Sequence, residues 1–309
     1  MEWIDRWKAE YWKSIKSFDT EEKLDLYLYR PLGFLIAKAS LPLGITPTQL
    51  TLVGLVLGIL CGRFFYHNET NASLTMASLL LFFAGVFDSS DGQLARMGGN
   101  STRFGLVLDG LCDNLVFGSA YAGCILTLQS EWDWKIWPVA LLGCFCHSFQ
   151  SALLDFYNRE FLFFGNGLNK HDYWNFTLSE AMKERESADT PGDRFFWKLR
   201  LTWIWQQNKL CNRPDHLRFA WKKHSLGPRK HEFQKLYATR NRWILRTWRI
   251  MGANFHTAMI ITFAFLRRFD LYLILVDIVG LTSCVFILRV FQKRQDRLLQ
   301  QDLVQRKFN

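Results

Sequence analysis

The sequence predicts an all-α integral membrane fold: six transmembrane helices, preceded by amphipathic juxtamembrane helices and interrupted by a cytoplasmic helical insertion. Hydrophobic residues make up 49% of the 309 positions, yet the mean hydropathy is only −0.03, so the apolar residues are concentrated in segments. A segment of about 20 apolar residues crosses a bilayer as a helix. The candidate segments are residues 47–66, 72–87, 105–128, 135–155, 254–266 and 271–291, of which 254–266 is short and must extend back towards Trp248.

Two amphipathic stretches precede the first span. Residues 2–18 place aromatic and aliphatic side chains near helical spacing, with Lys and Arg between them, and residues 22–41 repeat this pattern. We expect helices that lie on the membrane surface, with packing of the first helix on a protein partner as the alternative. Thr46 and Pro47 then form a typical N-cap and first helical position, so the juxtamembrane region ends at residue 46.

Lys and Arg predict the orientation of the spans. The connection 67–71 has neither residue and 129–134 is acidic, whereas the N-terminal arm, the middle segment and the C-terminal tail are basic. Basic connections stay in the cytoplasm, so both termini and the active site are expected there. Arg267 and Arg268 depart from this pattern.

Residues 159–249 form a polar and basic insertion between spans 47–158 and 250–309, with seven tryptophans. We expect a helical layer on cytoplasmic lipid headgroups, which also accounts for the net charge of +10. Nucleic acid is not an expected partner, because acids alternate with the bases, as in Lys183-Glu184-Arg185-Glu186. The seven cysteines have neither disulfide nor zinc spacing, and no cleavable signal peptide is expected.

Four aspartates stand in the second and third apolar segments. Each carboxylate in a bilayer costs roughly 2.5 to 3.5 kcal/mol unless it is compensated. Asp88 and Asp91 are three residues apart, and Asp109 and Asp113 are four apart, so each pair shares one helix face. Two such faces predict an oxygen-lined site for divalent metal, and the expected cofactor is Mg²⁺ or Mn²⁺, bound as two ions.

The aspartates belong to a longer pattern, D-x-x-D-G-x-x-A-R-x8-G-x3-D-x3-D, from Asp88 to Asp113. This pattern is similar to the signature of the CDP-alcohol phosphotransferase (CDP-alcohol phosphatidyltransferase) family. The resemblance implies a phospholipid-synthesising membrane transferase, commonly a homodimer, that uses a CDP-linked donor and a hydroxyl acceptor. It implies metal ligation by Asp88, Asp91 and Asp109, with Asp113 as fourth carboxylate and base.

The remaining motif positions suit the donor nucleotide. The small residues Gly92 and Ala95 let the nucleotide approach the backbone of their helix, and Gly105 does the same on the facing helix. Arg96 has planar donors for diphosphate oxygens. Asp88 is expected to contact the donor too, and Thr51 falls where the family often has a hydroxyl. Close helix packing by the small residues and snorkelling by Arg96 are the alternatives, which the joint set with four aspartates disfavours.

A polar stripe on the fourth span is the candidate acceptor pocket. His147, Ser151, Asp155 and Arg159 recur every four residues, and an interhelical hydrogen-bond seam is an equal alternative. Asp277 in the last span is isolated and is expected to be structural. The other histidines considered, His171, His216, His224, His231 and His256, have no ligand spacing and are expected at the surface or the membrane boundary.

These observations predict a CDP-alcohol phosphotransferase that moves a phosphatidyl or phospho-alcohol group and releases CMP. A donor such as CDP-diacylglycerol and a polyol or inositol-type acceptor are favoured. Residues 108–114 lack the Arg that follows the last Asp in many phosphatidyl-transferring relatives, so choline- or ethanolamine-phosphate transfer from a CDP-amine is the enzyme alternative. A divalent-cation transporter is the alternative of another class, but a cation path gains nothing from Arg96.

Overall fold

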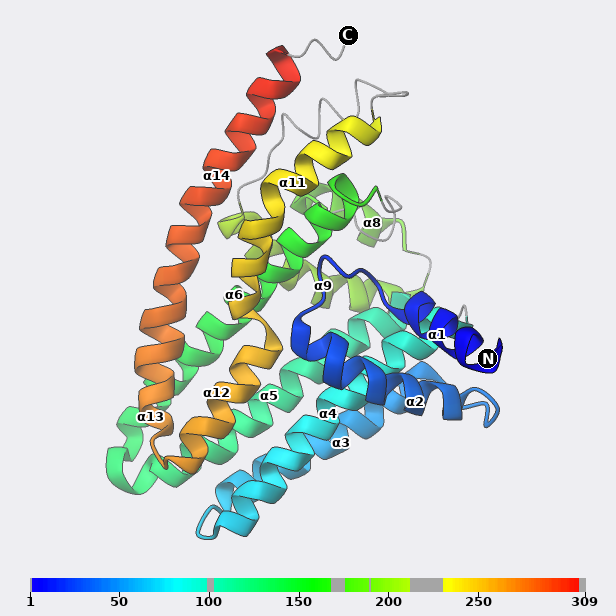
Figure 1. Cartoon of the computed structure of the whole chain (residues 1–309). Coiled ribbons are helices and arrows are strands. Elements are labelled where there is room, and N and C mark those ends of the chain that lie inside the picture. The colour runs from blue at the N-terminus through cyan, green and yellow to red at the C-terminus, as the bar shows by residue number, and fades with distance from the viewer. Residues whose placement is uncertain (1, 99–102, 168–175, 189, 212–229, 306–309) are drawn as a thin grey trace. The chain divides into compact units, whose positions relative to one another are not determined.

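The computed structural model describes residues 2–98, 103–167, 176–188, 190–211 and 230–305 of the chain (Figure 1). These residues form helices joined by short connections and include no β-strand. The all-α prediction is therefore confirmed for the described residues.

The helices follow the predicted segments closely, with longer bounds around the motif. The first half contains α1 (Glu2–Ser14), the π-helix η1 (Asp25–Tyr29), α2 (Arg30–Ser40), α3 (Pro47–Tyr66), α4 (Asn71–Gly98), α5 (Arg103–Trp132) and the 3₁₀ turn η2 (Asp133–Lys135). The second half contains α6 (Ile136–Phe164), α8 (Leu178–Glu186), α9 (Pro191–Leu210), α11 (Lys230–Trp248), η4 (Arg249–Met251), α12 (Ala253–Phe265), α13 (Phe269–Leu271), the π-helix η5 (Tyr272–Leu281) and α14 (Thr282–Gln305).

Four helical stretches among the described residues are long and apolar enough to cross a membrane. They are Pro47–Tyr66, Asn71–Gly98, Leu108–Phe164 and Phe269–Asp302. The third combines α5 and α6, which the sequence predicts as two spans, and the short helix α12 is not among the four. The stretches support a multi-pass membrane protein, whereas the count of six spans stays a prediction.

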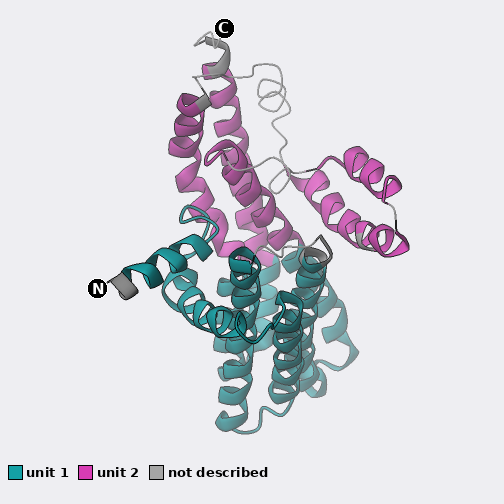
Figure 2. Cartoon of the chain, turned by 90° about the vertical axis from the view of Figure 1, so that its right-hand side faces the viewer, with its two compact units in different colours: residues 1–148, 253–278 teal, residues 149–252, 279–309 magenta. Residues whose placement is uncertain are grey.

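The chain divides into two compact units (Figure 2). One consists of residues 1–148 and 253–278, and the other of residues 149–252 and 279–309. The motif aspartates and the N-terminal helices belong to the first unit. The second unit contains the predicted insertion together with the end of α6 and the end of the chain, so it is larger than the insertion alone.

Helix α3 is the packing centre of the first unit, because glycines let two neighbours approach its backbone. A Cβ atom on Gly54 would lie 3.3 Å from the Ala84 carbonyl oxygen of α4, and one on Gly58 would clash with Val116 of α5. Small residues at four-residue spacing commonly allow such close contact between membrane helices. The start of α3 is fixed by a capping box in which Thr46 and Gln49 satisfy each other's backbone N–H groups.

Helix α1 packs on α2 of the same chain. The rings of Trp7 and Tyr11 meet Phe34 edge-on at centroid distances of 5.7 and 5.4 Å, and the Tyr11 hydroxyl donates to the Leu26 carbonyl at 2.9 Å. Part of the apolar face of α1 is thus covered by α2 of the same chain. Its placement on a membrane surface stays a prediction.

The second unit has cores of its own. Tyr157 of α6 stacks on the buried Trp248 of α11 at 4.6 Å, and Gln292 of α14 donates to Asn241 at 3.1 Å. Helices α8 and α9 enclose a small cluster built from Ala181, Trp197 and Ile204. The described part of the insertion is therefore helical, as predicted, and its contact with lipid headgroups stays a prediction.

A polar network lies inside the apolar core of the first unit. The Tyr121 hydroxyl contacts His147 Nδ1 at 3.1 Å and the Tyr272 hydroxyl at 2.7 Å, and it donates to Asp277 Oδ2 at 3.2 Å. The Tyr272 hydroxyl also meets Nδ1 of His256, whose ring stacks on His147 at 3.7 Å. The surface or boundary position predicted for His256 is wrong, since its exposed fraction is 0%. In the fold, neighbouring aromatic rings bury His256, and the Tyr272 hydroxyl contacts its ring nitrogen. The spacing of residues in the sequence indicates neither contact.

The hydroxyl of Tyr121 links three polar side chains, so we expect Tyr121→Phe to destabilise the protein. The change removes a donor to the buried Asp277, which costs about 1–2 kcal/mol in free energy of unfolding. Unfolding in mixed micelles measures the loss. The matched control is Tyr27→Phe, because Tyr27 is 81% exposed and its change is expected to stay within about 0.5 kcal/mol. Equal stability of the two variants would contradict the role of the network.

Candidate active site

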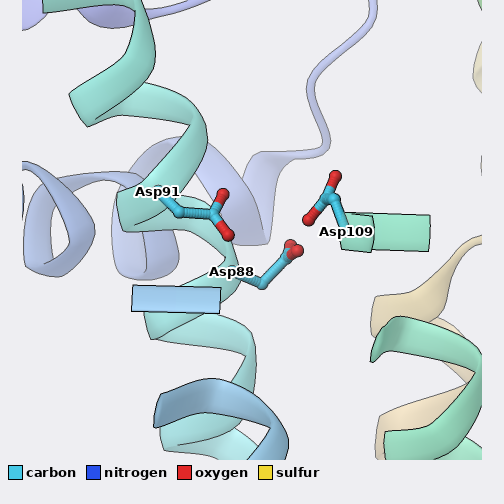
Figure 3. A group of neighbouring side chains, drawn as sticks. All are labelled: Asp88, Asp91 and Asp109. Atoms are coloured by element: carbon cyan, nitrogen blue, oxygen red, sulfur yellow. The ribbon is translucent and has the colours of Figure 1, made fainter. Parts of the chain in front are cut away.

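Three carboxylates from two helices converge. Asp88 and Asp91 lie on α4 and Asp109 lies on α5, and one oxygen of each is within 4.8 Å of the others. In Figure 3 the three side chains point towards one shared space. Asp91 is buried, Asp109 is half-buried and Asp88 is exposed, so the group opens on one side.

The fourth carboxylate, Asp113, lies one turn after Asp109 on α5. It is not part of the group of three, but its carboxyl approaches Asp88 closely enough for a side-chain hydrogen bond. Asp113 is exposed. The structure therefore gathers all four predicted aspartates around Asp88, with Asp113 at the accessible edge.

The carboxylates fit a divalent cation. Their oxygens are hard ligands of the kind that Mg²⁺ and Mn²⁺ prefer. Asp109 Oδ1 is buried without a hydrogen-bond partner, which is costly for a charged oxygen unless a cation meets it. Mutual repulsion among the acids adds to this cost. A cation among Asp88, Asp91 and Asp109 would relieve both.

Thr51 fixes one of these acids. Its buried hydroxyl, on α3, contacts Asp91 Oδ2 closely and also lies 3.1 Å from the carbonyl oxygen of Pro47. A donor to one carboxylate oxygen restricts the rotation of the group, which keeps the other oxygen directed at a ligand. Thr51 was predicted among the donor-binding residues, and its observed contact is with the acid.

Arg96 lies over Gly92, one turn away on α4. A Cβ atom on Gly92 would be 3.4 Å from Arg96 Nη1 and 3.5 Å from Nη2, which is ordinary contact distance, so the guanidinium lies directly over this position. Ala95 and Gly105 are half-buried on α4 and α5. Gly92 therefore borders an arginine, and the contact of both residues with a diphosphate stays a prediction.

Four residues close to the motif had not been identified from the sequence. They are Ser14 at the end of α1, Glu21, Arg30 at the start of α2, and Gln93 inside the motif. Arg96 Nε donates to the Ser14 carbonyl, and Gln93 Nε2 donates to the Ser14 hydroxyl at 2.9 Å. Their amphipathic context gave no sign of these contacts, because periodicity identifies a polar face and not its partner.

The predicted acceptor stripe is divided. His147 belongs to the first unit and to its buried network, whereas Asp155 and Arg159 belong to the second unit and form an ion pair at 2.9 Å. Asp155 also accepts hydrogen bonds from Trp203 and Gln207 of α9. These contacts favour the interhelical seam, and the acceptor role of the stripe, including the half-buried Ser151, stays a prediction. Of the other histidines, His231 is exposed as predicted, and His171, His216 and His224 lie outside the described residues.

Curated relatives share part of the chain. A phosphatidylinositol phosphate synthase of Mycobacteroides abscessus is 30% identical over 109 residues, 35% of this chain and 48% of the relative. An archaetidylinositol phosphate synthase of Pyrococcus horikoshii is 32% identical over 115 residues, 37% of this chain and 58% of the relative. A phosphatidylinositol phosphate synthase of Corynebacterium glutamicum is 36% identical over 98 residues, 32% of this chain and 43% of the relative. The chain spans about half the length of these relatives. No solved structure gives a significant match.

The family comparison covers the whole aspartate motif. Residues 44–159 match the model of the CDP-alcohol phosphatidyltransferases, and this region contains α3, the motif parts of α4 and α5, and most of α6. The motif-based resemblance and the family model thus agree on the same residues. This chain carries a CDP-alcohol phosphatidyltransferase domain at residues 44–159.

Proposed function

We propose that the protein is a metal-dependent CDP-alcohol phosphotransferase of phospholipid synthesis. It transfers a phosphatidyl group from CDP-diacylglycerol to the hydroxyl of an inositol-type acceptor and releases CMP. The observation that carries this proposal is the convergence of Asp88, Asp91 and Asp109 within a domain of this family. The relatives named as phosphatidylinositol phosphate synthases support the acceptor.

Each polar residue of the site has a defined task in this reaction. Asp88, Asp91 and Asp109 hold the cation, and Thr51 orients Asp91. A bound divalent cation would neutralise charge on the diphosphate oxygens as CMP departs. Arg96, whose guanidinium lies over Gly92, contacts the same diphosphate through its planar donors.

Asp113 is the base of this mechanism. It is exposed and outside the group of three, so it can meet an acceptor hydroxyl. Asp113 takes the hydroxyl proton, the acceptor oxygen forms the new bond to phosphorus, and the bond from phosphorus to the CMP oxygen breaks. CMP leaves with the electron pair of that bond. Both termini and this site face the cytoplasm in the proposed orientation, and a homodimer is the expected assembly.

A donor and acceptor panel tests the proposed reaction. Purified protein in detergent with Mg²⁺ is expected to release CMP from CDP-diacylglycerol when inositol phosphate is present, with product mass as the measurement. Glycerol phosphate and inositol serve as competing acceptors, and CDP-choline with diacylglycerol serves as the competing donor pair. Product formed only from the CDP-amine would contradict the proposal.

Asp91→Asn is expected to lower CMP release by about a hundredfold or more, because it removes one ligand charge and keeps the side-chain volume. Mn²⁺ binding without substrate should weaken in parallel. The matched control is Asp133→Asn, an exposed acid with φ of 52° in the turn after α5, where Asn is also tolerated. Near-normal activity of Asp91→Asn at saturating Mg²⁺ would remove this residue from the metal site.

Arg96→Lys keeps the charge and loses the planar fork. We expect the KM for the CDP-linked donor to rise about tenfold, since a charged two-bond contact becomes a point contact. Arg63→Lys, an exposed arginine on α3, is the control. An unchanged KM in Arg96→Lys would mean that this arginine only anchors α4 at the membrane boundary.

A further inference from the structure

The N-terminal segment contacts the catalytic helix at the motif itself. The end of helix α1 and the start of α2 reach residues 89, 93 and 96 of α4. These N-terminal residues precede the region that matches the family model, which begins at residue 44. The family model therefore does not cover these N-terminal residues, and it assigns no role to their contacts with α4.

One contact is an ion pair. Arg30 Nε and Nη2 donate to the two carboxylate oxygens of Glu21 at 3.0 and 2.9 Å, and the side chains are 17% and 6% exposed. Arg30 Nη1 donates to the Ser89 carbonyl at 3.3 Å. Burial disfavours the charged guanidinium, but Glu21, Asp25 and Asp88 more than offset it, so the pKa of Arg30 is raised. A two-bond pair of this kind has a fixed geometry and holds its third donor in place.

The bond from Arg30 to the Ser89 carbonyl acts on the part of α4 that carries two of the acids. Ser89 stands between Asp88 and Asp91, so a donor to its carbonyl oxygen restrains the turn that carries both acids. Gly33 allows the approach: a Cβ atom there would lie 2.7 Å from Gln93 Oε1 and 3.0 Å from Ser89 Oγ. Helix α2 is thus packed against the motif turn without an intervening side chain.

A second contact concerns Arg96. The Ser14 carbonyl, at the C-terminal end of α1, accepts from Arg96 Nε, and the Ser14 hydroxyl accepts from Gln93 Nε2. Carbonyls at a helix C-terminus carry partial negative charge and attract a guanidinium. Ser14 is buried, and its bond with Gln93 is buried as well, whereas its bond with Arg96 is partly buried. The bond through Nε directs the two terminal nitrogens of Arg96 over Gly92.

We propose that Ser14, Glu21 and Arg30 are positioning residues of the active site, which hold the Asp88–Asp91 turn for the metal and Arg96 for the donor. This inference rests on the proposed function. The N-terminal segment is then part of the catalytic machinery in addition to any role at the membrane surface.

The test measures Mn²⁺ binding to the full chain without nucleotide, together with the kinetics of CMP release. Glu21→Gln keeps the shape of the side chain and removes its charge, and Arg30→Lys keeps the charge and loses the fork. Residues that orient metal ligands typically contribute 10- to 100-fold to metal affinity, so we expect the Mn²⁺ Kd of Glu21→Gln to rise about tenfold. Arg30→Lys should show a smaller rise, and saturating Mn²⁺ should restore most of kcat in both.

The matched control is Glu10→Gln. It breaks the ion pair of Glu10 with Lys38, which joins α1 to α2 and does not involve α4, so the Mn²⁺ Kd should change less than about twofold. Thermal unfolding confirms that each variant is folded, and Arg30→Lys carries the test if Glu21→Gln does not fold. A lowered melting temperature with wild-type Mn²⁺ affinity in the folded variants would overturn the inference. Absence of Mn²⁺ binding in the wild type would instead overturn the proposed metal-dependent function.

Discussion

The repulsion among carboxylates of α4 and α5 has to be opposed by helix packing, and α3 supplies that packing. Gly54 lies against the backbone of α4 one turn before Asp88, and Gly58 and Gly62 lie against α5 beyond Asp113. Without side chains at these positions, α3 sets the separation of the two acidic helices and contributes the Thr51 hydroxyl that restrains Asp91. The N-terminal helices act on the same turn from another direction through Arg30 and Ser14. Contacts from α3 and from the N-terminal helices thus keep the charges of the acidic site together.

The spacing of the aspartates was enough to predict that each pair shares one helix face, because residues three or four apart lie on the same side whatever surrounds the helix, whereas the approach of the two faces depends on how α4 and α5 pack. The helical character of the chain and the start of α3 at Thr46 followed in the same way from local patterns. The contacts of Arg30 and Ser14 with α4 could not be predicted, since they join residues about 60 to 80 positions apart and depend on how α1 and α2 fold back. The sequence carried one overlooked sign, the glycines at 54, 58 and 62, whose regular spacing marks a close helix contact.

Histidine and aspartate residues in the later spans illustrate another limit. His256 has no neighbouring ligand in the sequence, yet in the fold it stacks on His147 and bonds to Tyr272. Asp277 was isolated in the sequence, and its partner Tyr121 comes from a helix more than 150 residues earlier. The predicted acceptor stripe shows the opposite case. Its residues recur every four positions on one helix, yet in the fold they contact different partners. Spacing describes one helix, whereas these environments are created by several.

The π-helix η5 explains why Asp277 joins that network. Residues five apart are about 140° apart around an α-helix but are stacked where the hydrogen bonds run from i to i+5. Tyr272 and Asp277 are five apart within η5, and both reach the Tyr121 hydroxyl. A π-helical stretch behaves as an α-helix that has accepted an extra residue. The winding of this segment is therefore as constrained as its composition: α-helical winding of the same residues would place Asp277 about 140° around the helix from Tyr272 and turn it away from its partners, although every side chain of the network would still be present.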